Sequence, residues 1–139
     1  MSVQEIRQSP MMSHLLDAMQ QGKDIGHYGR LSFAMVAQYF MKPDELVKWL
    51  EKGGASAEDA KALVAGVEER GYNPPSRGQI LAWQKQQEFQ ICPNPDDPNA
   101  CNVYQELSFP DSVYQNIKEY REEQFNADLA GTTNPPGNG

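Results

Sequence analysis

The sequence predicts an all-α fold, a compact multi-helix domain with an irregular Pro/Asn/Asp-rich loop and a disordered C-terminal tail. Three observations predict this class. Apolar residues recur at helical spacing, residues typical of helix ends stand between the apolar segments, and no segment shows the alternation typical of a strand. The 139 residues suffice for one domain with its own core, which we assign to 1–127. Residues 128–139, which include "GTTNPPGNG", have little to bury and are expected to be disordered.

The first three expected helices supply most of the core. The first has an apolar face formed by Met11, Leu15, Leu16 and Met19. Gly22 is expected to end it, as glycine does where a helix closes in a left-handed residue. The segment 31–41, "LSFAMVAQYFM", is apolar nearly all round and predicts a central helix covered on most sides. A third helix should begin near Pro43, where a missing N–H does no harm, and end at Gly53 and Gly54.

Two further helices are predicted by their capping residues. Ser56 with Asp59 three residues later resembles a capping box, and Gly71 should stop the helix that follows. The "YNPPS" segment then breaks the chain, because each proline forces its predecessor away from the helical region. Ser76 with Gln79 repeats the capping pattern and predicts a fifth helix. In the first of these helices we expect a buried stripe of Ala60, Leu63, Val64 and Val67. The second contains Ile80, Leu81 and Trp83.

The last third of the chain is less regular and strongly acidic. Short helices are expected at 100–107 and 111–125, after the irregular "CPNPDDPN". The net charge of −7 at pH 7 arises here, because 1–87 holds ten acidic and ten basic residues whereas 88–139 holds nine acidic and two basic ones. The chain therefore lacks the basic stripe typical of nucleic-acid binding, and any phosphate contact must come from the neutral part.

The sequence shows no sign of a membrane segment or of export. It has no run of eighteen apolar residues, and its start, "MSVQEIRQSP", lacks the basic and apolar regions of a signal peptide. We therefore expect a cytoplasmic protein. In a reducing compartment a cysteine pair is more often a metal or redox site, or two buried thiols, than a disulfide, so we disfavour a bond between Cys92 and Cys101.

One short motif indicates possible chemistry, whereas the common enzyme motifs GxxxxGK[ST], GxSxG and HExxH are absent. The segment 26–30, "GHYGR", places a histidine and an arginine just before the expected central helix. Free N–H groups and the helix dipole favour an anion at such a position. A phosphate site and a simple capping turn both remain open. His14, among apolar neighbours, is expected to be structural.

The order of these segments resembles a known family. A "PM" start with a leucine helix is followed by "GKDIGHYGRLSFAMVAQYF", "DELVKWL", "GYNPPS", two cysteines and "SFP". This ordered set is similar to the C-terminal iron–sulfur domain of the large subunit of archaeal and eukaryotic DNA primase. The resemblance covers roughly 9–120 and implies a helical fold.

In that family four cysteines hold a [4Fe–4S] cluster. The resemblance matches Cys92 and Cys101 to the third and fourth ligands, whereas Met11 and Arg77 stand where the first and second would be. A thioether and a guanidinium do not replace thiolates at such a cluster, and two thiols fall short of a structural zinc site. We therefore expect a degenerate loop without metal or other cofactor. Cys92 and Cys101 would be small buried hydrophobes. Arg77 would offer positive charge where the cluster was and is therefore a candidate phosphate-binding residue.

The resemblance also implies a role for the "GHYGR" segment. In the family, its histidine and arginine contact the triphosphate of the initiating nucleotide or the 5′ end of the primer. Carried over, the phosphate contacts would be His27 and Arg30, with the ring of Tyr28 nearby. The polymerising carboxylates of primase reside in its small subunit, so this chain alone is not expected to be an enzyme.

Two functions remain open. In the first, the chain is an accessory module that binds a nucleotide triphosphate or a primed template end for a separate polymerase or primase subunit. In the second, it is an interaction or adaptor protein that kept the helical fold and uses its acidic last third, including Glu119, Glu122 and Glu123, to bind a basic partner surface. The intact "GHYGR" favours the first function, and the net charge favours the second.

Overall fold

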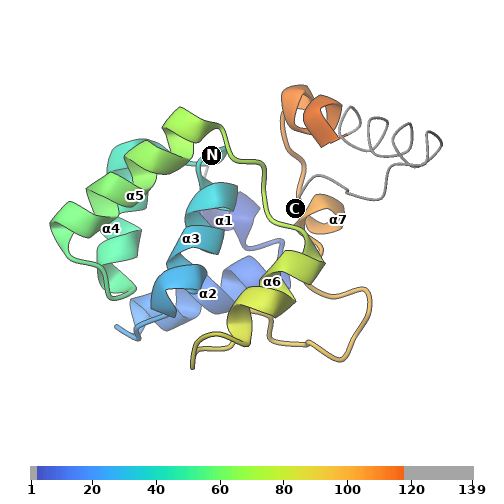
Figure 1. Ribbon diagram of the computed structural model, residues 1–139, viewed down its shortest axis with the longest axis horizontal. Coiled ribbons are helices and arrows are strands. Elements are labelled where there is room, and N and C mark those ends of the chain that lie inside the picture. Colours follow the sequence, from blue (N-terminus) through green and yellow to red (C-terminus); the bar gives the residue numbers. More distant parts are fainter. Residues whose placement is uncertain (1–2, 118–139) are drawn as a thin grey trace, which may run out of the picture. The chain divides into compact units, whose positions relative to one another are not determined.

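The computed structural model describes residues 3–117, and every described element is helical, as the sequence predicts (Figure 1). The chain divides into two compact units, one ending at Leu107 and the other beginning at Ser108. The first unit contains seven labelled helices in its described part: α1 Val3–Ile6, α2 Pro10–Gln20, α3 Gly26–Ala37, α4 Pro43–Lys52, α5 Ala57–Arg70, α6 Arg77–Gln84 and α7 Val103–Glu106. No helix in 3–117 is long and apolar enough to cross a bilayer.

The helix α3 lies at the centre of the first unit, which confirms the expectation of a central core helix. It contacts α2, α4, α5 and α6, and Figure 1 shows it between the α4–α5 pair and α6. Its side chains from Ser32 to Ala37 are all buried. Around it the core includes Leu15 and Leu16 of α2 and Leu50 of α4. The surrounding helices therefore all pack against α3, which is their common apolar element.

Helix ends that depend on a local signal lie where the sequence predicts them. The Ser56 hydroxyl accepts a hydrogen bond from the Asp59 amide, and the Ser76 hydroxyl accepts one from the Gln79 amide. Each serine thereby satisfies one of the unpaired N–H groups of a first turn. At the other end of α5, Gly71 adopts the left-handed conformation, with φ of 61°. These contacts confirm the predicted starts of α5 and α6 and the predicted end of α5.

The start of α3 differs from the prediction. We expected the "GHYGR" segment to precede the helix, but α3 begins at Gly26 and contains the whole segment. The N-cap residue Ile25 makes no side-chain cap bond, but the Asp24 carboxylate just before it accepts a hydrogen bond of 2.8 Å from the Gly26 amide and so satisfies one N–H group of the first turn. Gly26 has φ of +79°, which favours glycine, and a Cβ there would lie 2.5 Å from Gln87 Oε1, so the Gln87 side chain would have to shift. Arg30 is consequently a helical residue rather than part of a preceding turn.

The segment between α6 and α7 forms an irregular loop, as its proline content predicts. The helix expected at 100–107 is shorter, α7 being limited to Val103–Glu106, because the Asn102 side chain caps it by accepting from the Tyr104 amide. The buried Ser9 hydroxyl donates a 2.6 Å hydrogen bond to Glu106 Oε1. This contact joins the start of α2 to α7 across 97 residues of chain.

The second unit is described only in its first residues. A helix occupies 111–117, in agreement with the start of the helix expected at 111–125. Phe109 lies just before this helix, and its amide donates to the Tyr114 hydroxyl at 3.0 Å. The remainder of that helix, the expected domain boundary at 127 and the tail 128–139 lie outside the described residues.

Candidate functional site

The first turn of α3 carries three of the predicted site residues. His27 and Arg30 are three residues apart and therefore lie on one face of the helix. Two of the amides expected to attract an anion are already bonded within the chain. The Gly26 amide donates to the Asp24 carboxylate, and the Tyr28 amide donates to Gln87 Oε1 at 2.9 Å. Any anion at this helix start would therefore depend mainly on side chains.

Arg30 is held in place by one of its terminal nitrogens. Its Nη1 donates to Asp24 Oδ1 at 2.7 Å and to the Gly53 carbonyl oxygen at 3.0 Å. Nε and Nη2 have no hydrogen-bond partner among the described residues, so two donors remain for a ligand. The side chain is 18% exposed whereas that of Asp24 is 70% exposed. The hydrogen bond from the Gly26 amide, together with that from Arg30, holds the pKa of Asp24 below its ordinary value of 3.8.

Three rings form a row at the start of α3. The Tyr28 and Trp83 rings are stacked, with centroids 5.6 Å apart and planes inclined by 17°. The His27 ring meets the Tyr28 ring edge-on, with centroids 5.1 Å apart. His27 is exposed, and no described residue forms a hydrogen bond with its imidazole. A partly exposed row of rings can stack on a base. The unused donors of Arg30, three residues after His27 on the helix, can contact a phosphate.

Gln87 connects this ring row to the segment after α6. Its Oε1 accepts from the Tyr28 amide, and its Nε2 donates to the carbonyl oxygens of Ile25 and Phe89 at 2.9 and 3.0 Å. One half-buried side chain thus satisfies three backbone groups from two distant segments. It fixes the position of α3 relative to the chain that follows Trp83.

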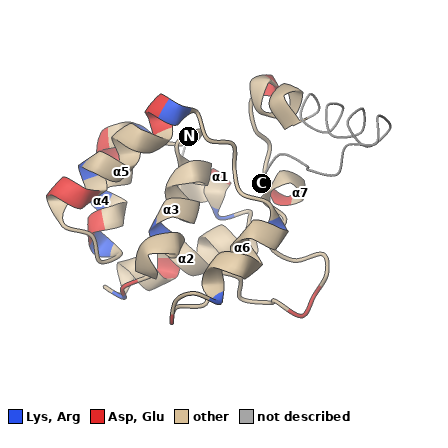
Figure 2. Cartoon of the chain, in the orientation of Figure 1, with Lys and Arg blue, Asp and Glu red and all other residues tan. Residues whose placement is uncertain are grey.

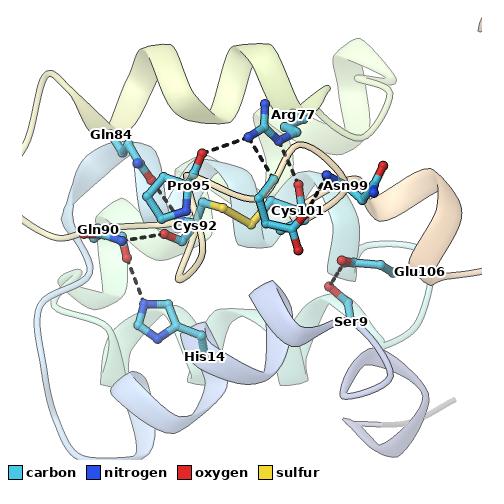
Figure 3. Close-up of a disulfide and its surroundings, with 12 residues drawn as sticks. Ser9, His14, Arg77, Gln84, Gln90, Cys92, Pro95, Asn99, Cys101 and Glu106 are labelled. Atoms are coloured by element: carbon cyan, nitrogen blue, oxygen red, sulfur yellow. Dashed lines mark hydrogen bonds between the residues drawn. A yellow bond between two sulfur atoms is a disulfide. The ribbon is translucent and has the colours of Figure 1, made fainter.

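Arg77 lies in a different place from the other predicted phosphate ligands. It is the first residue of α6, whereas Trp83 is in the last turn. Figure 3 shows its guanidinium directed at the loop between the two cysteines. Nε donates to the Ala100 carbonyl oxygen at 3.0 Å, and Nη2 donates to those of Pro95 and Asp97 at 2.9 and 3.0 Å. Arg77 therefore holds three carbonyl groups of one loop.

Cys92 and Cys101 form a disulfide, and here our expectation of two free thiols is wrong (Figure 3). Both residues are buried, as expected, but their Cα atoms lie 5.8 Å apart, within the usual range for a disulfide. The argument from a reducing compartment could not reveal this proximity. The fold brings the two residues together because the loop is closed by Arg77 and by hydrogen bonds at Cys92. In 3–117 no group of three or more His, Cys, Asp or Glu side chains is placed to hold a metal ion.

The remaining singled-out residues are part of the framework. Met11 lies fully buried in the first turn of α2. The His14 ring stacks on Phe89, with centroids 5.2 Å apart, and its Nε2 lies 2.8 Å from the Gln90 carbonyl oxygen. His14 thus has the structural role that its apolar neighbours suggest.

The structure brings together His27, Tyr28 and Arg30, and adds residues that sequence reasoning did not select for the site. Asp24, Trp83 and Gln87 complete the surroundings of the helix start. Only Asp24 had a local signal, as an acceptor two residues before a glycine. Figure 2 shows Lys and Arg interspersed with Asp and Glu along α4 and α5.

Comparison with protein-family models, curated proteins and solved structures finds no match for this chain.

Proposed function

We propose that the chain is a non-catalytic accessory module that binds an initiating nucleoside triphosphate, or the 5′-phosphorylated end of a primed template, for a separate polymerase. The observation that carries the proposal is that the start of α3 holds both the row of rings His27, Tyr28 and Trp83 and the unused Nε and Nη2 of Arg30. It provides both parts of a nucleotide site, a stacking surface for the base and donors for the phosphates.

The chemistry of the row suits a ligand whose sequence is not read. Stacking is tolerant of base identity because every base offers a π face, and it contributes about 1–3 kcal/mol per base. The Arg30 guanidinium, anchored by Asp24 and Gly53, presents its remaining edge without having to be ordered on binding. An exposed His27 can donate to a phosphate oxygen from one ring nitrogen.

The loop between Cys92 and Cys101 is a second observation that supports the resemblance to the primase large-subunit domain. Three of the four positions matched to cluster cysteines meet there, since Arg77 bonds to the loop that Cys92 and Cys101 close. A residue that replaces a ligand and holds the former cluster loop by its carbonyl groups is consistent with a degenerate cluster domain. On this proposal the partner is a polymerase or primase subunit and the chain is cytoplasmic.

The second candidate is an adaptor that binds a basic protein surface. One observation favours it: the Gly26 and Tyr28 amides are bonded to Asp24 and Gln87, so the helix start offers less to an anion than the sequence suggested. The glutamates expected to carry this function, Glu119, Glu122 and Glu123, lie outside the described residues.

Calorimetric titration with a nucleoside triphosphate tests the proposal. The wild type should bind, and Arg30→Ala should weaken binding by about 1.5–3 kcal/mol through loss of charge-assisted hydrogen bonds. Arg30→Lys should recover only part of it, because an ammonium lacks the planar fork. Wild type without binding at millimolar triphosphate would refute the proposal. Loss of partner binding only when Glu119, Glu122 and Glu123 are changed together to Gln would favour the adaptor.

A further inference from the structure

The disulfide closes a loop whose middle is exposed but whose ends are buried. Asn94 and the residues 96–99 are exposed, whereas Cys92 is fully buried and Cys101 is 2% exposed. Besides turn hydrogen bonds within the loop, such as that from the Ala100 amide to the Asp97 carbonyl oxygen, the exposed part is held by the disulfide and by the three hydrogen bonds from Arg77. Segments of this kind open locally at lower free energy than the core around them.

Cys101 adopts a backbone conformation that is unfavourable for a residue with a side chain. Its φ is 65°, and it is the one residue other than glycine in 3–117 with a positive φ. An L-residue with a Cβ is strained there, and such strain persists only where the surroundings impose it. The surroundings at this point are the bond to Cys92 and the hydrogen bond from Arg77 Nε to the preceding carbonyl group of Ala100. Breaking the disulfide removes one of these two constraints.

The other end of the disulfide is connected to the ring row. The Cys92 amide donates to Gln84 Oε1 at 2.8 Å, and Gln90 Nε2 donates to the Cys92 carbonyl oxygen at the same distance (Figure 3). Gln84 is the last residue of α6 and follows Trp83, whose ring stacks on Tyr28. A change in the position of Cys92 therefore acts on the last turn of α6, where the stacking partner of Tyr28 is held.

We propose that Cys92 and Cys101 are a reversible dithiol–disulfide pair, and that the oxidised state fixes the loop 92–101 and, through Gln84, the ring row of Tyr28 and Trp83. The last step, control of nucleotide affinity, rests on the function proposed above. In a cytoplasmic protein a disulfide is usually transient or redox-sensing, and that compartment supplies dithiol reductants.

The chemistry is a two-electron exchange with a dithiol of the thioredoxin or dithiothreitol class. A thiolate of the reductant attacks one cysteine sulfur, the bond between Cys92 and Cys101 breaks, and the departing cysteine thiolate takes up a proton. The second thiol of the reductant, once deprotonated, then attacks the mixed disulfide and releases the other cysteine, which is protonated in turn. Two electrons and two protons pass to the cysteine pair, and the reductant becomes a disulfide. Because both sulfurs are buried, the exposed loop must open first.

The test compares oxidised and dithiothreitol-reduced full-length protein by amide hydrogen exchange, circular dichroism and titration with a nucleoside triphosphate. We expect reduction to leave the helical signal unchanged and to accelerate exchange at 93–102, at 84–92 and at the Tyr28 amide. Triphosphate affinity should fall at least about fivefold, the lower end of usual coupling between two sites. Reoxidation should restore it. The double variant Cys92→Ala/Cys101→Ala should match the reduced protein and ignore the reductant.

If triphosphate binds equally in both states, the switch is refuted and the proposed function stands. If triphosphate binds in neither state, the proposed function fails, and the exchange data decide the switch separately. In that case, acceleration that extends to 84–92 and Tyr28 supports the coupling, and acceleration confined to 93–102 refutes it. Global unfolding on reduction would show a purely structural bond and would also refute the switch.

Discussion

Arg77 Nε lies 3.0 Å from the carbonyl oxygen of Ala100, the residue that precedes Cys101. With the two bonds from Nη2 to Pro95 and Asp97, this contact makes one guanidinium the common partner of three backbone carbonyl groups. Carbonyl groups left without a donor at a partly buried position cost free energy. The loop between the cysteines is thus organised by a residue that stands fifteen positions before Cys92.

Arg77→Ala should therefore destabilise the protein without affecting the first turn of α3. We expect the free energy of unfolding, measured with urea, to fall by about 1.5–3 kcal/mol, the range for hydrogen bonds to a charged group. The free energy of unfolding of the Arg77→Lys variant should fall almost as far, because an ammonium cannot reach three acceptors with the geometry of the guanidinium. An Arg77→Ala variant as stable as the wild type would contradict this role.

Reduction of the disulfide should lower stability by a similar amount. A loop of this length restricts the unfolded chain enough to contribute about 2–3 kcal/mol. Urea unfolding of the oxidised protein, with and without dithiothreitol, measures the difference directly. The Cys92→Ala/Cys101→Ala variant is the control and should show no response to dithiothreitol. If the wild type also shows none, the two cysteines are not bonded in solution.

Two glycines of the α5 region should respond to alanine in opposite directions. Gly66 lies inside α5, and a Cβ there would meet nothing within 4 Å. Gly66→Ala should therefore stabilise the fold by about 0.5–1 kcal/mol. Gly71 has equal space but a φ of +61°, so Gly71→Ala should destabilise by roughly 1–2 kcal/mol. Thermal unfolding of both variants checks this, and a destabilised Gly66→Ala would contradict the described position of α5.

The contact between Asp24 and Arg30 should appear in the pH dependence of stability. Because the pKa of Asp24 is lowered in the folded state, its contribution is complete above about pH 5 and is lost as the pH falls through that lowered pKa. Asp24 is mostly exposed, so the contribution should not exceed about 1 kcal/mol. Asp24→Asn should flatten the decline in the free energy of unfolding between pH 5 and 2.5. Parallel curves for wild type and variant would contradict the contact.

Features set by neighbouring residues could be predicted from the sequence, and features set by distant ones could not. The caps at Ser56 and Ser76 and the stop at Gly71 need only residues within one turn, and all three are observed. The apolar segment 31–41 likewise predicts a central helix, because a helix that is buried on most sides is apolar nearly all round.

The bonding of the Tyr28 amide and the disulfide could not be predicted, because each depends on how the chain folds around it rather than on a local pattern. Gln87 reaches Tyr28 from 59 residues away, and no pattern near "GHYGR" reveals that the Tyr28 amide is already bonded. For the cysteines, composition suggested a compartment, and the compartment suggested free thiols, but neither fixes the distance between two side chains. Trp83 shows the same limit, because the sequence places it within a helix but does not reveal that its ring stacks on Tyr28.

The central claim is that the start of α3 binds the phosphates of a nucleotide or primer. It is tested most directly by comparing two ligands that differ only in their 5′ phosphates. A primer–template with a 5′-triphosphate should bind at least about tenfold more tightly than the same duplex with a 5′-hydroxyl, as expected for one or two charge-assisted hydrogen bonds. The preference should weaken with salt, with a log–log slope of about −1 to −3, and His27→Ala and Arg30→Ala should each reduce it. Equal affinity for the two ligands at low salt would contradict the account.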